Sequence, residues 1–143
     1  MHKTIYLTVL LSFFGFLSLH GQLYYGGGVQ YNVDASAPGL QGKLFFEIDD
    51  TWRGSGTFTL HFDNTLNWTI DLDGHYKLLD VTDRFNISPL AGLAIVDLNS
   101  GTSIGFNLGA FIDVVFGEKH VYFEPKFTIR SGTALVLSGG VFF

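Results

Sequence analysis

The side chains best suited to chemistry in this sequence are charged residues that recur in balanced numbers. Five cations and five carboxylates lie on the polar positions of segments in which every second residue is apolar. These ten residues are Lys43, Glu47, Asp71, Asp73, Lys77, Arg84, Asp113, Glu124, Lys126 and Arg130. A lone buried charge is costly, whereas opposite charges in a confined space neutralise one another. The balance therefore predicts an enclosed, ion-paired network.

Residues for catalysis or metal binding follow no known motif. His61, Asp63 and Ser103 are the candidates for a hydrolytic triad, but isolated residues of these types are common, and no nucleophile motif marks the chain. His61, His75 and His120 lack metal-ligand spacing, and the sequence has no cysteine. We therefore predict a non-enzymatic protein without a metal or a cofactor.

The elements that carry the charged residues alternate between apolar and polar positions, the period of a β-strand with two different faces. Eight such segments are expected, at residues 25–31, 40–48, 58–62, 66–72, 85–95, 104–116, 121–129 and 135–143. Residues 49–56 are expected to form a turn. Pro125 is expected to mark a bulge, because proline cannot donate to a strand ladder. The pattern predicts one all-β domain of about eight strands.

Two architectures would satisfy this alternation: a soluble barrel or sandwich with an apolar core, and a membrane barrel with an apolar outer face. The chain has 143 residues, of which 47% are hydrophobic and 15% charged, against about 25% charged in soluble proteins. An even number of strands, with lengths near the 9 to 11 residues of a tilted membrane crossing, is typical of bacterial barrels. The sequence favours an up-and-down antiparallel transmembrane β-barrel.

Aromatic residues on the apolar positions gather near the expected strand ends, as interfacial girdles do. One girdle is expected to contain Tyr25, Phe46, Phe58, Phe85, Phe116 and Phe143, and the other Tyr31, Phe62 and Phe106. The polar positions are rich in glycine, which suits a crowded interior. These glycines are Gly26, Gly28, Gly92, Gly105, Gly109 and Gly140.

The first residues have the features of a secretory signal: a basic start, a short apolar stretch and a small residue at the expected cut. We predict a signal peptide at residues 1–21 and a barrel domain at residues 22–143. The apolar stretch is shorter than the roughly 20 residues of a membrane-spanning helix. The expected location is the outer membrane, and the sequence pI of about 5.3 argues against a nucleic-acid partner.

Three stretches resemble small porin-family outer-membrane barrels of the OmpA/OmpX type: residues 82–93, 105–110 and 138–143. The resemblance implies an eight-stranded barrel in a Gram-negative outer membrane, with membrane lipid as its surroundings. The terminal aromatic residue resembles the signal read by the barrel assembly machinery. The long surface loops of the family are missing here, which weakens the case for an adhesin or a receptor.

The interior of an eight-stranded barrel is just wide enough for side chains to fill it. We therefore predict a plugged, ion-paired lumen and a structural or envelope-interaction role. Two alternatives stay open: a narrow ion or water channel, and a soluble lipocalin-like carrier of an apolar ligand. The carrier would point Leu44, Phe46, Ile70 and Leu108 inward.

Overall fold

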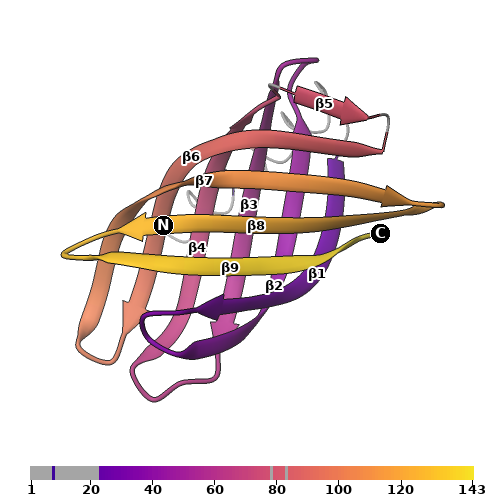
Figure 1. Ribbon diagram of the computed structural model, residues 1–143. Helices are drawn as coiled ribbons and strands as arrows, with labels where there is room; N and C mark the ends of the chain where they lie inside the picture. Colours follow the sequence, from indigo (N-terminus) through magenta and orange to yellow (C-terminus); the bar gives the residue numbers. More distant parts are fainter. Residues whose placement is uncertain (1–7, 9–22, 78, 83) are drawn as a thin grey trace.

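The structure, a computed structural model, describes residue 8 and residues 23–77, 79–82 and 84–143, and nearly all of this is β-strand (Figure 1). The strands are β1 (Leu23–Asn32), β2 (Ala37–Glu47), β3 (Trp52–His61), β4 (Leu66–Tyr76), β5 (Leu79–Thr82), β6 (Phe85–Leu98), β7 (Gly101–Phe116), β8 (Lys119–Ile129) and β9 (Thr133–Phe142). The expected signal peptide lies outside the described residues, apart from Thr8.

The strands form a closed antiparallel barrel. Neighbours along the chain pair with one another, except that β4 pairs with β6 and not with β5, and β1 pairs with β9 to complete the ring. Within the described residues, eight strands therefore make the up-and-down barrel wall. The short β5 is not needed to close this ring; it pairs with the first residues of β6, on the edge of β6 that pairs with β4 from Leu90 onward. No helix in the described part of the chain is long and apolar enough to cross a membrane.

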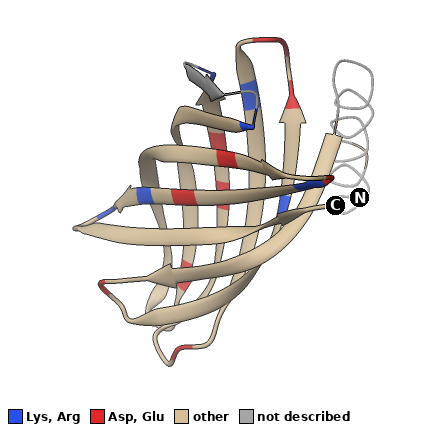
Figure 2. Cartoon of the chain, turned by 45° about the vertical axis from the view of Figure 1, so that its right-hand side comes forward, with Lys and Arg blue, Asp and Glu red and all other residues tan. Residues whose placement is uncertain are grey.

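The barrel has two ends that we name by what they carry. The terminus end holds Leu23, Phe143 and the turns at 48–51 and 117–118. The distal end holds the short connections at 33–36, 62–65, 99–100 and 130–132. Carboxylates mark turns at both ends (Figure 2). One of them, Asp49, accepts hydrogen bonds from the backbone N–H groups of Thr51 and Trp52, each at 2.7 Å.

Two sequence predictions about the strands are wrong. Residues 49–56 are not all turn, because β3 begins at Trp52 and its first residues pair with both β2 and β4. Pro125 does not mark a bulge, since the β7–β8 register is the same on both sides of it. Register shifts occur elsewhere, between Leu66 and Trp68 in the β4–β6 pairing and between Asp80 and Thr82 in the β5–β6 pairing.

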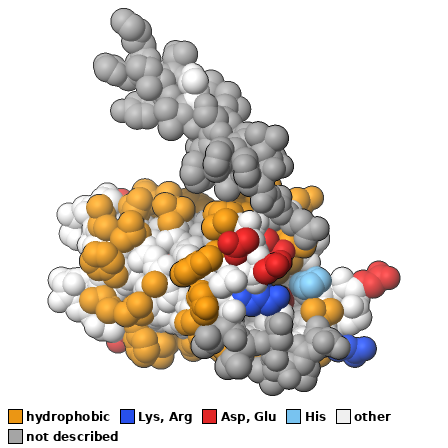
Figure 3. Space-filling model, turned by 90° about the horizontal axis from the view of Figure 1, so that it is seen from above, with side chains coloured by type: hydrophobic (Ala, Val, Ile, Leu, Met, Phe, Trp, Pro, Cys, Tyr) orange, Lys and Arg blue, Asp and Glu red, His pale blue; other side chains and the backbone are white. Residues whose placement is uncertain are grey.

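The distribution of polarity is inverted relative to a soluble protein. Lysines, carboxylates, amides and hydroxyls are buried inside the barrel, while large apolar side chains cover its outside. The space-filling view shows apolar side chains over the flank and charged ones gathered near the terminus end (Figure 3). The core of this protein is therefore mostly polar, and its apolar surface faces outward.

The distal turn at 62–65 is held by the carboxylate of Asp63. Asp63 Oδ2 accepts hydrogen bonds from the Thr65 hydroxyl at 2.7 Å, the Thr65 N–H at 3.2 Å and the Leu66 N–H at 3.3 Å. The Thr65 hydroxyl bond, followed by the backbone bonds, lowers the pKa of Asp63. This turn is therefore stabilised above the pKa of an unfolded aspartate, about 3.9. The stabilisation is lost as the pH falls through the lower pKa of the folded state.

We expect Thr65→Val to raise the pKa of Asp63 toward its ordinary value, because the strongest hydrogen-bond donor is removed. An NMR titration of the side-chain carboxyl groups measures this shift. The pKa of Asp49, which is lowered by N–H donors in a different turn, should stay unchanged in the same variant. An unchanged pKa for Asp63 would show that the hydroxyl bond does not stabilise the carboxylate.

Candidate functional site

The centre of the lumen contains a buried ion pair between β2 and β8. Lys43 Nζ lies 2.7 Å from Glu124 Oε2, and the two side chains are 0% and 1% exposed. The same ammonium donates to the Thr57 hydroxyl on β3 at 2.9 Å. One lysine therefore joins three strands of the barrel wall from the inside.

A second ion cluster lies beside the first. Lys126 Nζ is 3.3 Å from Asp71 Oδ1 and 3.4 Å from Asp73 Oδ2. The Asn107 amide NH₂ donates to Oδ1 of both aspartates, at 2.8 and 2.9 Å, and its carbonyl accepts from the Thr128 hydroxyl at 2.9 Å. We call the charged residues of the two clusters, together with Asn107, the charged layer. Its members are Lys43, Asp71, Asp73, Asn107, Glu124 and Lys126.

Toward the terminus end the lumen is filled by rings, which we call the aromatic layer. Its members are Phe45, Leu90, Phe111 and Tyr122, with Tyr24 and Phe142 packed against them. The ring centroids of Phe45 and Phe111 are 5.2 Å apart and nearly parallel. The Arg53 guanidinium lies over both rings, at 5.1 and 5.9 Å, and donates to the Ser88 hydroxyl.

Toward the distal end the lumen is filled by aliphatic side chains. This aliphatic layer consists of Ala37, Leu66, Ala94 and Val96, with Leu98 against them. A cavity beside it has a volume of about 20 Å³, and one at the terminus end has about 60 Å³. Spaces of this size hold about one or two water molecules. The charged layer is thus enclosed between two apolar layers.

The remaining predicted network residues lie outside the charged layer. Glu47 and Asp113 are half-buried around the terminus-end cavity, where Asp113 is 3.8 Å from His120. Lys77 is half-buried beyond the end of β4, and Arg84 is exposed just before β6. Arg130 is half-buried at the distal cavity. The alternation places these residues near strand ends, where the enclosed lumen gives way to the rims.

The structure separates the predicted aromatic residues between the two ends, with one correction. Phe58 lies six positions after the start of β3 and pairs with Gly42 in mid-barrel, so it does not join the terminus-end girdle. Trp52 and Tyr76 are there instead, with ring centroids 5.1 Å apart. The other aromatic residues at the terminus end are Tyr25, Phe116 and Phe143, which are exposed, and Phe46 and Phe85, which are half-buried. The exposed residues toward the distal end are Tyr31, Phe62 and Phe106.

The three candidates for a hydrolytic triad, His61, Asp63 and Ser103, do not form a catalytic site. His61 Nε2 pairs with the Thr69 hydroxyl at 3.0 Å, and Asp63 is occupied by its own turn. A different serine–histidine pair, not expected from the sequence, is formed by Ser55 Oγ and His75 Nε2, which are 2.9 Å apart. Both residues are buried beneath the aromatic layer, where a substrate has no access. Among the described residues, no group of three or more His, Asp or Glu could hold a metal ion.

Arg53 and the inward aromatic rings are functional-site residues that sequence reasoning missed. Arg53 stands among Gly54, Ser55 and Gly56, a composition typical of a turn. Phe45 stands between Leu44 and Phe46, so an apolar run obscures which of the three points inward. Extending the polar positions of residues 57, 59 and 61 backward through Ser55 would have placed Arg53 on the interior face.

The glycines of the polar positions allow this dense interior. A Cβ atom at Gly28 or Gly140 would lie 2.8 Å from the Tyr122 hydroxyl oxygen. A Cβ at Gly109 would overlap Lys126. Cβ atoms at Gly26, Gly92 and Gly105 would also collide with neighbouring atoms. Close approach of backbone and bulky side chains therefore requires glycine at these inward positions.

Together, the closed eight-stranded ring, the polar interior and the apolar exterior define the fold of a small outer-membrane β-barrel. The N-terminal β-barrel domain of Pseudomonas aeruginosa OprF is similar, with 18% identity and a TM-score of 0.67 over 86% of this chain and 99% of that one. A de novo designed transmembrane β-barrel has 13% identity and a TM-score of 0.60, covering 87% and 94% of the two chains.

Ail, the attachment invasion locus protein of Yersinia pestis, solved with the heparin analogue sucrose octasulfate, has 12% identity. Its TM-score is 0.55, over 87% of this chain and 99% of that one. No protein-family model and no curated protein matches the sequence. The structural likeness confirms the predicted eight-stranded barrel fold and its resemblance to small outer-membrane barrels.

The structure contradicts the packing expected of a lipocalin-like carrier. Leu44 and Leu108 are exposed on the outer face, and Phe46 and Ile70 share the outward positions of their strands. The Phe46 ring covers Gly54 on the outside of the wall. The interior that would hold an apolar ligand is occupied by the charged layer instead.

Proposed function

We propose that this chain is a non-enzymatic integral protein of the outer membrane with a closed lumen and a structural or envelope-interaction role. The observation that carries the proposal is the enclosed charged layer inside a wall whose outer face is apolar. Hydrocarbon is the solvent that such an outer face suits. A lumen filled by paired side chains gives the barrel rigidity without a path for solutes.

Export and assembly are part of the same proposal. A cleaved signal peptide at residues 1–21 would direct the chain out of the cytoplasm. The barrel assembly machinery would then insert it, as the resemblance of residues 138–143 to the recognition signal suggests. Both termini of the barrel would face the periplasm, and the short distal connections would face outward.

The charge of the distal end argues against binding of polyanions such as the one solved with Ail. Asp34 and Asp63 occupy two of the distal connections, and Asp97 lies at the end of β6. Arg130 lies in another of the distal connections. Carboxylates repel sulfate groups, so we propose contacts with neutral or cationic envelope components in preference to sulfated ligands.

The wild-type protein should remain in the membrane fraction and should migrate differently on a gel before and after boiling. A detergent-solubilised barrel resists unfolding until it is heated, because its strand pairing is closed. Folded, monomeric protein in buffer without detergent would contradict the membrane assignment.

Planar bilayers containing the wild-type protein should show no steady open-channel current, because both ends of the charged layer are covered by apolar side chains. Lys43→Ala removes a central charge and should leave this baseline unchanged if the apolar layers close the lumen. A steady wild-type current that changes in Lys43→Ala would identify a channel through the charged layer.

A further inference from the structure

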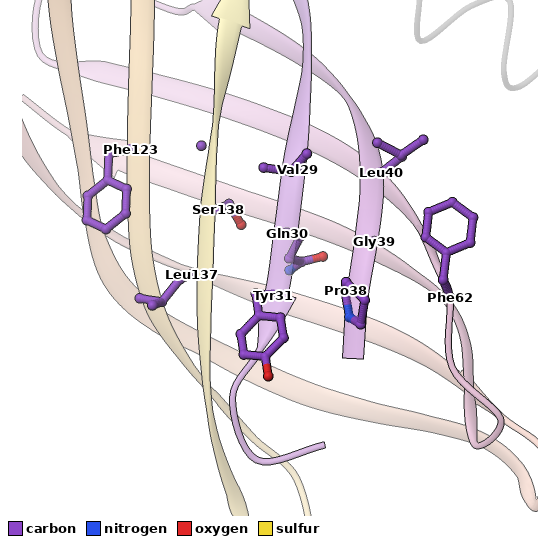
Figure 4. Close-up of a pocket in the computed structure, with 11 residues that line it drawn as sticks. Val29, Gln30, Tyr31, Pro38, Gly39, Leu40, Phe62, Phe123, Leu137 and Ser138 are labelled. Atoms are coloured by element: carbon purple, nitrogen blue, oxygen red, sulfur yellow. The ribbon is translucent and has the colours of Figure 1, made fainter. Parts of the chain in front are cut away.

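A groove crosses the outer face of the barrel over β8, β9, β1 and β2 (Figure 4). Its volume is about 580 Å³, within the range of sites that hold small molecules. In the close-up, Val29 and Tyr31 project between Phe123 and Leu137 on one side and Leu40 and Phe62 on the other. The groove begins near the distal girdle, where Tyr31 and Phe62 lie, and continues toward mid-barrel.

The strand register explains why the wall is hollow here. Gly139 pairs with Val29 on β1 and with Phe123 on β8, so it lies directly between these two side chains. Its missing side chain leaves a space on the outer face. One row nearer the distal end, the compact ring of Pro38 lies beside Tyr31. A glycine inside a strand often marks a place where another molecule approaches the backbone closely.

The residues that line the groove are suited to binding a hydrocarbon. Its outward side chains are aliphatic or aromatic, while Gln30 and Ser138 are buried on the interior side of the wall. Backbone groups are engaged in the strand ladders. The Tyr31 hydroxyl is the polar group available at the distal end of the groove. A hydrogen-bonding ligand would therefore find few partners along most of its length.

We propose that this groove binds one acyl chain of a bilayer lipid, with the lipid headgroup at the distal girdle beside Tyr31. This inference rests on the proposed membrane location, because the groove is continuous with the apolar outer face that would contact lipid. A thin, flexible chain can enter the space that Gly139 leaves between Val29 and Phe123. The convex wall of a second barrel cannot follow it.

Gly139→Leu tests the proposal by filling the groove without disturbing the fold. A Cβ at Gly139 would have its nearest neighbours at 3.5 and 4.0 Å, which is ordinary contact. Gly74→Leu is the matched control, since this outward glycine on β4 has its nearest neighbour at 3.7 Å and lies outside the groove.

Native mass spectrometry of the full chain, released from nanodiscs of phosphatidylethanolamine, measures lipid retained per barrel. We expect the wild type and Gly74→Leu to retain one lipid, and Gly139→Leu to retain it about tenfold less. Equal retention by Gly139→Leu and the wild type, or no retention by any of them, would overturn the acyl-chain site. Dimers that disappear in Gly139→Leu would overturn it in favour of a second copy.

The same preparations separate this inference from the proposed function. If the wild-type barrel inserts into nanodiscs and changes its gel mobility on heating but retains no lipid, the acyl-chain site is contradicted and the proposed membrane location is not. A wild-type chain that does not enter the nanodiscs contradicts the membrane location, and the groove proposal falls with it.

Discussion

Glu124→Ala should lower the free energy of unfolding by about 3 to 5 kcal/mol, because it leaves the Lys43 ammonium buried without its closest counter-charge. Lys43 has no exposed side-chain surface through which water could replace the lost carboxylate. Urea unfolding of the barrel in lipid vesicles measures the change. Glu118→Ala, in the exposed turn at 117–118, is the control and should change stability by less than about 0.5 kcal/mol.

The double variant Lys43→Met/Glu124→Leu identifies the source of the loss. Replacing both members of a buried ion pair by apolar side chains is often nearly neutral, because no charge is left without a partner. The double variant should therefore be more stable than Glu124→Ala alone. A double variant that loses as much stability as the two single changes combined would show that the pair does not act as a unit.

Gly28→Val should prevent the barrel from closing, because the inner face of the seam between β1 and β9 has no space for a side chain at this position. A Cβ at Gly28 would lie 2.7 Å from the Gly140 Cα and 2.8 Å from the Tyr122 hydroxyl oxygen. The clash with backbone is not relieved by rotating a side chain. We expect the heat-sensitive folded band on a gel to disappear for this variant.

Gly27→Val is the matched control for this change. Gly27 is the adjacent residue of β1, but it faces outward, and its nearest neighbour to a new Cβ is 3.7 Å away. Valine also favours strands, so this variant should fold as the wild type does. Equal folding of both variants would mean that the inner face at the seam is not close-packed.

The two faces of each strand were predictable from the chain because alternation is a local property. Successive side chains of a strand point to opposite sides whatever the strand pairs with. This is why Lys126 and Glu124 could be assigned to the polar face, and Leu44 and Leu108 to the apolar face, before any contact was known. The eight alternating segments likewise indicated the closed barrel.

Turn composition was a weaker guide, as residues 49–56 show. Glycine and serine there are typical of a loop, but pairing with strands on both sides extends β3 back to Trp52. Long-range pairing overrides local preference in sheets. Because β3 was expected to begin too late, Phe58 was predicted to lie at a rim, and Arg53 was not predicted to face the interior.

The amino-acid sequence is enough to assign an ionic face and an apolar face to every strand. Which charges meet, and at what depth in the barrel, depends on the three-dimensional fold. Lys43 and Glu124 are 81 residues apart, and their contact depends on the stagger of β2 and β8 around the ring. Closure of the ring and the stagger of its strands depend on all eight strands together, so they cannot be inferred from any single segment of the sequence. They also enclose the charged layer between the aromatic and aliphatic layers.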